Sequence, residues 1–375
     1  MIKNNKHQLS IPLLFPIGLL LVLFAFTQWK SLRLSSKDQN SLSVASQPPI
    51  LNDSTEVDRK QKGAHIFTKF NPIDFQILTR NNIEWVTLVP WGFQDDHNSA
   101  KVNHHNGDSL QIQQSNASWL QQLEQVRSAG FKVFVKPHVW IDNPSDGKWR
   151  SDIFPSNDEN WELWKSTYRD FILRYASLAE EGQAEMFCIG TEFSRLSVEK
   201  PNFWKALIQE VRNVYSGKIT YAANWYQEYE DIHFWNKLDY IGIQAYFPLV
   251  KNEYPTVQQI SDGWNKYLSD LSSVHKKYNR RIIFTEMGYK STADSAIKPW
   301  EWMDDPYSTS KSYSYKTQEN CYQAFFNTIW PKPWIAGVHI WNLRDDKLEE
   351  HPDKKNLDFT PIGKPAEKVI AKGFE

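Results

Sequence analysis

This 375-residue chain has few cysteines and almost no net charge. Its two cysteines, Cys188 and Cys321, are too few for a disulfide framework in a chain of this size. Because each lies in an apolar stretch, we predict two buried thiols that pack as small hydrophobic side chains. The formal net charge at pH 7 is only −1. Phosphate binding needs a basic face, so this balance argues against nucleic acid as the main partner.

The longest apolar run lies at the N-terminus. Residues 11–27 carry no charged side chain, and Lys3 and Lys6 precede them. The run is at the short end for a transmembrane helix and longer than the usual core of a signal peptide. No small-x-small cleavage site follows it directly and no cysteine ends it, so a lipoprotein anchor is disfavoured. The pattern favours a signal anchor at residues 1–30, with a cleaved export signal as the alternative.

The remainder of the chain divides into a tether and one domain. Residues 31–62 are serine-rich, contain Pro48 and Pro49, and are typical of a flexible linker. From Gly63 to the C-terminus the composition is uniform, which predicts a single domain over residues 63–375. We expect this domain to lie outside the cytoplasm, anchored in the cell envelope or secreted, with membrane contact through the N-terminal segment only.

The domain alternates short apolar segments with helical patterns, which predicts an α/β fold of eight strand–helix units, a (β/α)₈ TIM barrel. The predicted strands are 64–67, 85–89, 132–135, 185–189, 219–222, 240–243, 281–284 and 335–340. The predicted helices are 119–129, 161–180, 203–215, 264–278, 318–330 and a final one around 365–371, with a short fifth crossover near 231–236. An open doubly wound sheet is the competing architecture. It usually has a glycine-rich turn after its first strand, and residues 67–72 contain no glycine.

Two glutamates stand at the ends of predicted strands. Glu192 follows the fourth strand and Glu286 the seventh. A carboxylate there is costly unless it is hydrogen-bonded or needed for chemistry, and the carboxyl ends of barrel strands form the active site. Facing glutamates favour glycosidic bond cleavage, in which one carboxyl protonates the leaving oxygen and the other attacks the anomeric carbon or activates water. A separation of about 5 to 5.5 Å would give retention, and roughly 6.5 to 9.5 Å would give inversion.

Three segments carry a family resemblance: residues 136–140, 189–192 and 284–289. They resemble glycoside hydrolase family 113 of clan A, whose described members are β-mannanases, and the likeness covers roughly residues 63–343. The resemblance implies a retaining barrel enzyme without a cofactor that cleaves a β-linked polysaccharide or oligosaccharide, β-1,4-mannan above all, by double displacement. Glu192 would be the general acid/base and Glu286 the nucleophile. Many clan members have asparagine before the acid/base, where it contacts the sugar 2-hydroxyl, whereas this chain has Thr191.

Aromatic residues are abundant, with 17 Trp and 16 Tyr, and several fall where predicted strands end. Apolar sugar faces stack on such rings, and hydroxyls need polar partners between them. Tyr246 is either a hydrogen-bond donor to Glu286 or a wall residue. The predicted substrate-binding residues are Trp91, Lys136, His138, Trp140, Asn224, Trp225, Tyr246, Tyr289 and Trp341.

Three alternatives stay open from the sequence. A metal-dependent barrel hydrolase would use His65, His138 and His339, but the domain lacks a His-x-His pair, and His339 lies inside a strand where a hydrogen-bonded core histidine is expected. We therefore predict no metal site. A surface barrel that binds polysaccharide without cleaving it often lacks one of the two carboxylates. Within the enzymes, a β-glucosidase-type or β-glucanase-type specificity is the alternative to mannan.

Overall fold

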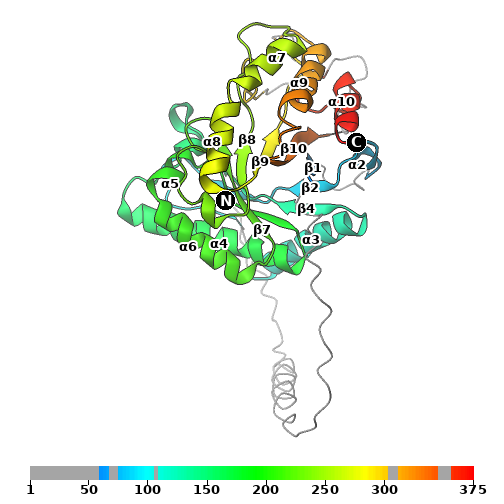
Figure 1. Ribbon diagram of the computed structural model, residues 1–375. Helices are drawn as coiled ribbons and strands as arrows, with labels where there is room; N and C mark the ends of the chain where they lie inside the picture. The colour runs from blue at the N-terminus through cyan, green and yellow to red at the C-terminus, as the bar shows by residue number, and fades with distance from the viewer. Residues whose placement is uncertain (1–58, 67–74, 105–108, 303–310, 345–355) are drawn as a thin grey trace, which may run out of the picture. The chain divides into compact units, whose positions relative to one another are not determined.

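The computed structural model describes residues 59–66, 75–104, 109–302, 311–344 and 356–375 (Figure 1). The predicted anchor at residues 1–30 and most of the predicted tether lie outside the described residues. Within the described ranges, no helix is both long enough and apolar enough to cross a membrane. The first strand begins at Gln61, where it pairs with Gly337, so the last two residues of the predicted tether belong to the domain.

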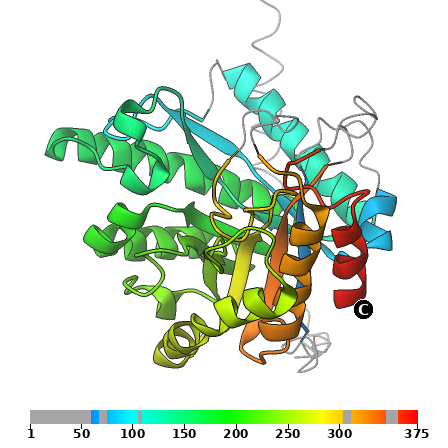
Figure 2. The same cartoon turned by 90° about the horizontal axis from the view of Figure 1, so that it is seen from above.

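Eight parallel strands close into a barrel, which confirms the predicted fold class and rules out the open sheet (Figures 1 and 2). The order around the barrel is β1-β10-β9-β8-β7-β6-β4-β2. Each predicted strand is one of these eight, within a few residues at its ends. Their bounds are β1 Gln61–Ile66, β2 Trp85–Leu88, β4 Lys132–Val135, β6 Met186–Thr191, β7 Lys218–Asn224, β8 Ile241–Gln244, β9 Ile282–Met287 and β10 Ile335–Leu343.

The strands are apolar along their whole length because both of their faces are covered. Inside the barrel, seven buried side chains pack together. On the outside, the strands pack against the surrounding helices in a larger hydrophobic cluster. Parallel strands buried on both faces show continuous apolar runs of this kind, which is why the sequence pattern located them. The seven inner residues are Trp85, Phe134, Met186, Cys188, Ala222, Ile283 and Ala336.

Most predicted helices are present, but the one expected over residues 264–278 is interrupted at residues 266 and 267. Two helices occupy this region, α7 Val257–Asn265 and α8 Leu268–Tyr278. At the break, the Tyr267 hydroxyl donates to the carbonyl oxygen of Pro248 at 2.9 Å, which ties the junction to the segment after β8. The fifth crossover is short as expected, with only a 3₁₀ turn, Trp235–Lys237. The other predicted helices are α3 Ser109–Ser128, α4 Asp158–Glu181, α6 Pro201–Val214, α9 Tyr315–Thr328 and α10 Pro365–Gly373.

Four short elements escaped the sequence analysis. Two of them form a small parallel sheet beside the barrel, and the other two are six-residue helices. Short elements give too few residues for a periodic pattern to be visible. They are β3 Trp91–Gln94, β5 His138–Ile141, α2 Phe75–Arg80 and α5 Ser194–Glu199.

Buried polar groups in the barrel interior find partners. His339 lies 2.6 Å from the Thr87 hydroxyl through Nδ1 and 3.1 Å from Gln61 Oε1 through Nε2, so it is the hydrogen-bonded core histidine that the sequence predicted. Burial lowers its pKa well below the ordinary value, which keeps the ring neutral.

Cys188 and Cys321 are free and buried, also as predicted.

Gly242 offers a test of how tightly β7 and β8 pack. A Cβ at this position would lie 2.2 Å from the carbonyl oxygen of Tyr221 and 2.7 Å from the hydroxyl of Thr220. The backbone oxygen cannot move aside without disturbing β7. We expect Gly242→Ala to cost about 1–3 kcal/mol of stability through overpacking and to lower Tm by several degrees. Differential scanning calorimetry measures this, and an unchanged Tm would contradict the close packing.

Candidate active site

A cavity of about 920 Å³ opens at the carboxyl ends of the barrel strands. Its wall is mostly aromatic, with a few polar and charged groups among the rings, as in sites that bind sugars. Both strand-end glutamates reach it. The lining residues are Trp91, His138, Trp140, Trp149, Arg150, Ser151, Glu192, Asn224, Trp225, Tyr226, Tyr246, Glu286, Trp300, Trp302, Trp341, Asn342, Arg344 and Phe359.

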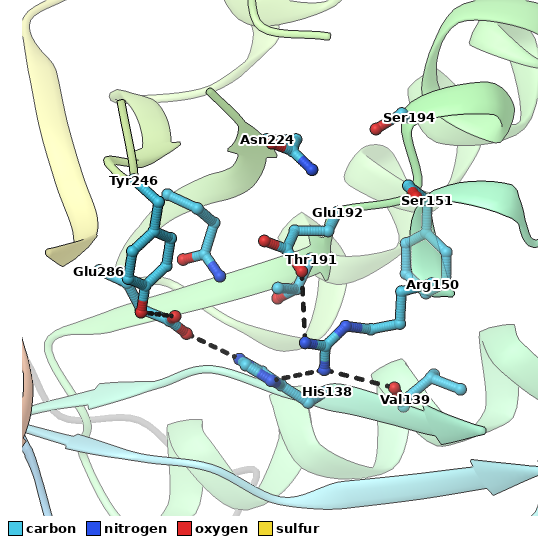
Figure 3. A network of polar contacts seen from close by, with 12 residues as sticks. His138, Val139, Arg150, Ser151, Thr191, Glu192, Ser194, Asn224, Tyr246 and Glu286 are labelled. Atoms are coloured by element: carbon cyan, nitrogen blue, oxygen red, sulfur yellow. Dashed lines mark hydrogen bonds and ion pairs between the residues drawn. The ribbon is translucent and has the colours of Figure 1, made fainter. Parts of the chain in front are cut away.

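Glu286, in β9, is a buried carboxylate with three close partners. Only 3% of the residue is exposed. The Lys136 ammonium donates to Oε1. The Tyr246 hydroxyl donates to Oε2 at 2.8 Å, and His138 Nε2 lies 3.4 Å from Oε1 (Figure 3). A buried carboxylate is stable only when it is paired and hydrogen-bonded in this way. Of the two alternatives that the sequence left for Tyr246, hydrogen bonding to Glu286 is the one seen.

The groups around Glu286 hold defined protonation states. Burial raises the pKa of Tyr246 well above its ordinary value, and the neighbouring carboxylate raises it further, so the phenol stays a donor. Burial lowers the pKa of Lys136, while the charge of Glu286 opposes that fall. Burial, together with the charges of Lys136 and Arg150, lowers the pKa of His138 well below its usual range. His138 is therefore a neutral ring between two cations.

Arg150 connects the surroundings of the two glutamates (Figure 3). Its guanidinium Nη2 lies 3.2 Å from Glu192 Oε2, and Nη1 lies 3.1 Å from His138 Nδ1. His138 in turn lies next to Glu286 through its other nitrogen. A continuous series of charged and polar groups thus runs from Glu192 through Arg150 and His138 to Glu286.

Glu192 differs from Glu286 in both exposure and backbone. It follows β6, its side chain is 12% exposed, and its φ is +58°, in the left-handed region. For a residue other than glycine this conformation costs on the order of 1–2 kcal/mol, so the surrounding structure must hold it. The Glu192 N–H donates to the carbonyl oxygen of Ala222 at 2.9 Å, and the N–H of Phe193 donates to the Tyr221 hydroxyl at 2.9 Å.

The aromatic side chains of the cavity form separate groups. Trp140 makes edge contacts with Trp91 and Trp149, at ring-centroid distances of 6.0 and 5.3 Å. Trp225 stacks on Trp300 at 5.1 Å. The cavity also contains a stacked pair of Trp302 and Phe359, at 5.8 Å.

Trp341, in β10, also lines the cavity. It is largely buried, stacks parallel to His138 at 6.3 Å and makes an edge contact with His65 at 5.0 Å. Exposed ring faces on several sides of one cavity suit the apolar faces of sugar units.

Two of the predicted binding residues lie outside the cavity lining. Tyr289 is fully buried and packs edge-on against Tyr322 of α9, with ring centroids 5.5 Å apart. A Cβ on the preceding Gly288 would lie 2.1 Å from the Trp341 carbonyl oxygen, so the chain turns closely past β10 and Tyr289 enters the core. Lys136 is also fully buried, and its contacts are Glu286 and His138.

The other nine predicted site residues are brought together. Trp91, His138, Trp140, Glu192, Asn224, Trp225, Tyr246, Glu286 and Trp341 all line the cavity. The sequence analysis missed nine lining residues, and all of them except Asn342 of β10 lie outside the strands and α-helices: Trp149, Arg150, Ser151, Tyr226, Trp300, Trp302, Asn342, Arg344 and Phe359. The tryptophans beside proline and glycine were the available signal for the loops, but nothing in the sequence placed them at the barrel mouth.

The loop that carries Trp300 and Trp302 is fixed by an ion cluster. Lys290, whose side chain is fully buried, donates to the carbonyl oxygen of Glu301 at 2.8 Å. Lys311 bridges the carboxylates of Asp294 and Glu301, both at 2.7 Å. Glu301 lies between the two tryptophans in the sequence, so these bonds hold both rings at the cavity.

Two histidines of the metal-dependent alternative, His138 and His339, make other contacts. His339 is bonded inside the barrel, and His138 lies between two cations, where a metal ion would be repelled. Across the described part of the chain, no group of three or more His, Cys, Asp or Glu side chains is arranged to hold a metal ion.

A second buried carboxylate lies behind Glu192. Glu228 is fully buried and accepts from the Tyr221 hydroxyl, from Ser197 Oγ at 2.9 Å and from the backbone N–H of Asn224 at 2.6 Å. Burial raises the pKa of its carboxyl from 4.5 to about 7, against the effect of its hydrogen bonds, and the nearby charge of Glu192 adds to the rise.

This raised pKa predicts a pH-dependent contribution to stability. The folded chain keeps the Glu228 proton between pH 4.5 and about 7 while the unfolded chain releases it, so stability falls as pH rises through this window. The upper bound is roughly 3 kcal/mol. We expect the Tm of the native chain, measured relative to that of Glu228→Gln, to be lower at about pH 8 than at about pH 5. A Tm difference that is constant over this range would contradict the assignment.

The comparisons with known proteins agree with this geometry. The model of the family described as Glycoside Hydrolase Family 113 matches residues 66–364. A solved β-1,4-mannanase of this family is 26% identical, with a TM-score of 0.68, over 84% of this chain and 98% of its own. The β-mannanase from Alicyclobacillus acidocaldarius, solved in complex with ManMIm, is 25% identical, with a TM-score of 0.69, over 84% of this chain and 97% of its own.

More distant structures share the barrel alone. A β-glucuronidase from Ruminococcus gnavus is 11% identical, with a TM-score of 0.52, over 80% of this chain and 46% of its own. The search of curated proteins finds no match. The family match spans nearly all of the barrel, including both strand-end glutamates and every residue that lines the cavity. The chain therefore belongs to glycoside hydrolase family 113 and is a glycoside hydrolase.

Proposed function

We propose that the chain is a retaining β-mannanase that hydrolyses β-1,4-linked mannan by double displacement. The observation that carries the proposal is a pair of differently held carboxylates, Glu192 and Glu286, in one aromatic cavity. The solved family members titled β-1,4-mannanase, at 26% and 27% identity, support the choice of sugar.

Glu286 has the surroundings of a nucleophile. Lys136 and Tyr246 hold its carboxylate in one orientation in a site that excludes most water. In the first step a Glu286 oxygen attacks the anomeric carbon while the bond to the leaving oxygen breaks, which gives a glycosyl ester. The fixed donors keep the carboxylate in place until it attacks.

Glu192 has the surroundings of the acid/base. It is the more exposed of the two carboxyls and lies beside Asn224 at the cavity wall. It gives its proton to the leaving oxygen in the first step. In the second step it takes a proton from the water that attacks the anomeric carbon, and Glu286 leaves as a carboxylate.

The sugar specificity is tested with soluble protein that begins before Gln61 and so keeps β1 whole. Mannan, glucomannan, cellulose, xylan and mannooligosaccharides are offered, and reducing ends and products are measured. We expect cleavage of mannan and mannooligosaccharides and a loss of at least about 10⁴-fold in Glu286→Ala. Preferred cleavage of cellulose would point to a β-glucanase instead. Binding without cleavage of any of these by folded protein would favour the non-catalytic alternative.

The roles of the two carboxyls are tested separately. Glu192→Ala should lose about 10²–10⁴-fold in kcat/KM on oligosaccharides, but far less on aryl glycosides whose leaving group needs no proton. Azide should restore part of the Glu286→Ala activity and give a product of inverted configuration, because the small anion attacks where the carboxylate is missing. Azide rescue of Glu192→Ala with inversion would show that the two roles are exchanged.

We further propose that residues 1–30 anchor the enzyme in the cell envelope with the barrel outside the cytoplasm, or that they direct its secretion. The uncharged run at residues 11–27, behind Lys3 and Lys6, supports this location. An extracytoplasmic enzyme would also meet polysaccharide directly. Recovery of the full chain from the cytosol after cell fractionation would contradict the proposal.

A further inference from the structure

Glu228 is a buried carboxylate that the proposed mechanism does not use. It follows β7, is fully buried, and is not part of the cavity wall. Four donors converge on its two oxygens. They are the Tyr221 hydroxyl, Ser197 Oγ at 2.9 Å, Ser194 Oγ at 3.1 Å and the Asn224 backbone N–H at 2.6 Å. Above a pH of about 7 this carboxyl is ionised, and as a carboxylate it is an acceptor only, which matches the four donors.

Most of these contacts lead to the chain directly after Glu192. Ser194 and Ser197 belong to α5, which begins two residues after Glu192. The Tyr221 hydroxyl, which donates to Glu228, also accepts from the N–H of Phe193 at 2.9 Å. Glu228 is thus linked to the turn that follows Glu192 by three contacts. Two are direct bonds from Ser194 and Ser197, and the third runs through the Tyr221 hydroxyl to the N–H of Phe193.

The remaining contact leads to the neighbouring strand. Asn224 ends β7 and lines the cavity, and its backbone N–H donates to Glu228. The carboxylate therefore ties the end of β6 to the end of β7. The backbone of Glu192 itself is bonded to β7 through Ala222.

The backbone of Glu192 needs such support because its φ of +58° is unfavourable for a residue with a side chain. If the turn at residues 193–197 relaxed, the Glu192 carboxyl would change direction. Proton transfer is sensitive to the distance and direction of the acid, so a shift of this kind would slow bond cleavage.

We propose that Glu228 is a positioning residue for Glu192, which holds the acid/base in its left-handed turn by binding the segment 193–197 and the end of β7 together. The proposal rests on the acid/base role of Glu192 in the proposed function. Glu228 itself does not touch the substrate. Its loss acts on the reaction only through the geometry of Glu192 and, to a lesser degree, of Asn224.

The test compares two substrates with the same sugar units on the non-reducing side of the cleaved bond. One has a 2,4-dinitrophenyl leaving group, which needs no proton, and the other has a sugar leaving group, which does. The measured quantity is the ratio of their kcat/KM values. Losses that act through Asn224 or through general instability affect both substrates and cancel in this ratio.

The kinetics are measured at about pH 8, where Glu228 is ionised, so Glu228→Gln keeps the size of the side chain but turns an amide N–H₂ toward donors. We expect kcat/KM on the sugar leaving group to fall by roughly tenfold or more, and that on the aryl glycoside by no more than about threefold. Tyr221→Phe removes the hydroxyl between Glu228 and Phe193 and should change the ratio in the same direction. If Glu228→Gln does not fold, Tyr221→Phe and Glu228→Asp carry the test. Because Glu228→Asp keeps the carboxylate, its ratio should lie closer to that of the native enzyme.

Tyr215→Phe is the matched control. It also removes a buried tyrosine hydroxyl, one that donates to the Ala184 carbonyl oxygen at 2.8 Å, just before β6 and at the opposite end from Glu192. It should lower Tm and leave the ratio unchanged.

The outcomes separate this inference from the proposed function. If Glu192→Ala changes the leaving-group ratio and both Glu228→Gln and Tyr221→Phe leave it as in the native enzyme, the positioning role is wrong and the acid/base role stands. If Glu192→Ala leaves the ratio unchanged, the acid/base assignment fails and the positioning role fails with it. A change in the ratio for Tyr215→Phe equal to that for Tyr221→Phe would also overturn the inference, because general loosening of β6 would then suffice.

Discussion

The buried negative charge of Glu286 is the constraint around which the site is organised. A carboxylate with 3% exposure is costly in a barrel interior unless cations and donors surround it. Lys136 supplies the cation, and Lys136 is itself fully buried, so neither charge is stable there without the other. Tyr246 supplies a phenol that stays protonated. These groups come from the ends of three different strands, and only a closed barrel brings such ends to one point.

The second carboxyl is held by different means, and this difference is the basis for the different roles that we propose for the two glutamates. Glu192 lies nearer to solvent, and its direction depends on an unfavourable backbone conformation supported by hydrogen bonds from β7. Glu286 is held through its own carboxylate, which suits the attack that we propose for it. The Glu192 carboxyl contacts the Arg150 guanidinium. The position of Glu192 is set by the backbone hydrogen bonds of Glu192 and Phe193. Pairs of carboxyls in unlike environments are the usual basis for dividing nucleophile and acid/base roles.

The barrel could be predicted from the sequence because strands covered on both faces are apolar throughout, and this made all eight visible. Glu192 and Glu286 were predictable because Glu192 directly follows such a strand and Glu286 lies near the end of another. Arg150 was not, since it lies in a loop whose approach to the barrel mouth is set by contacts with His138 and Glu192. The incorrect prediction for Tyr289 came from extending the cavity face past the end of β9, where the close passage of Gly288 along β10 redirects the chain. Glu228 showed no signal at all in a polar stretch, because its donors come from α5 and β7.

The stereochemistry of the first-formed product tests the central claim most directly. Double displacement at Glu286 inverts the anomeric carbon twice, so hydrolysis of a β-linked mannooligosaccharide should release the β-anomer at the new reducing end. Proton NMR spectra recorded within the first minutes, before the anomers interconvert in solution, distinguish the two forms. Initial accumulation of the β-anomer is the predicted result. Initial accumulation of the α-anomer would mean a single displacement by water, and Glu286 would then be a base rather than a nucleophile.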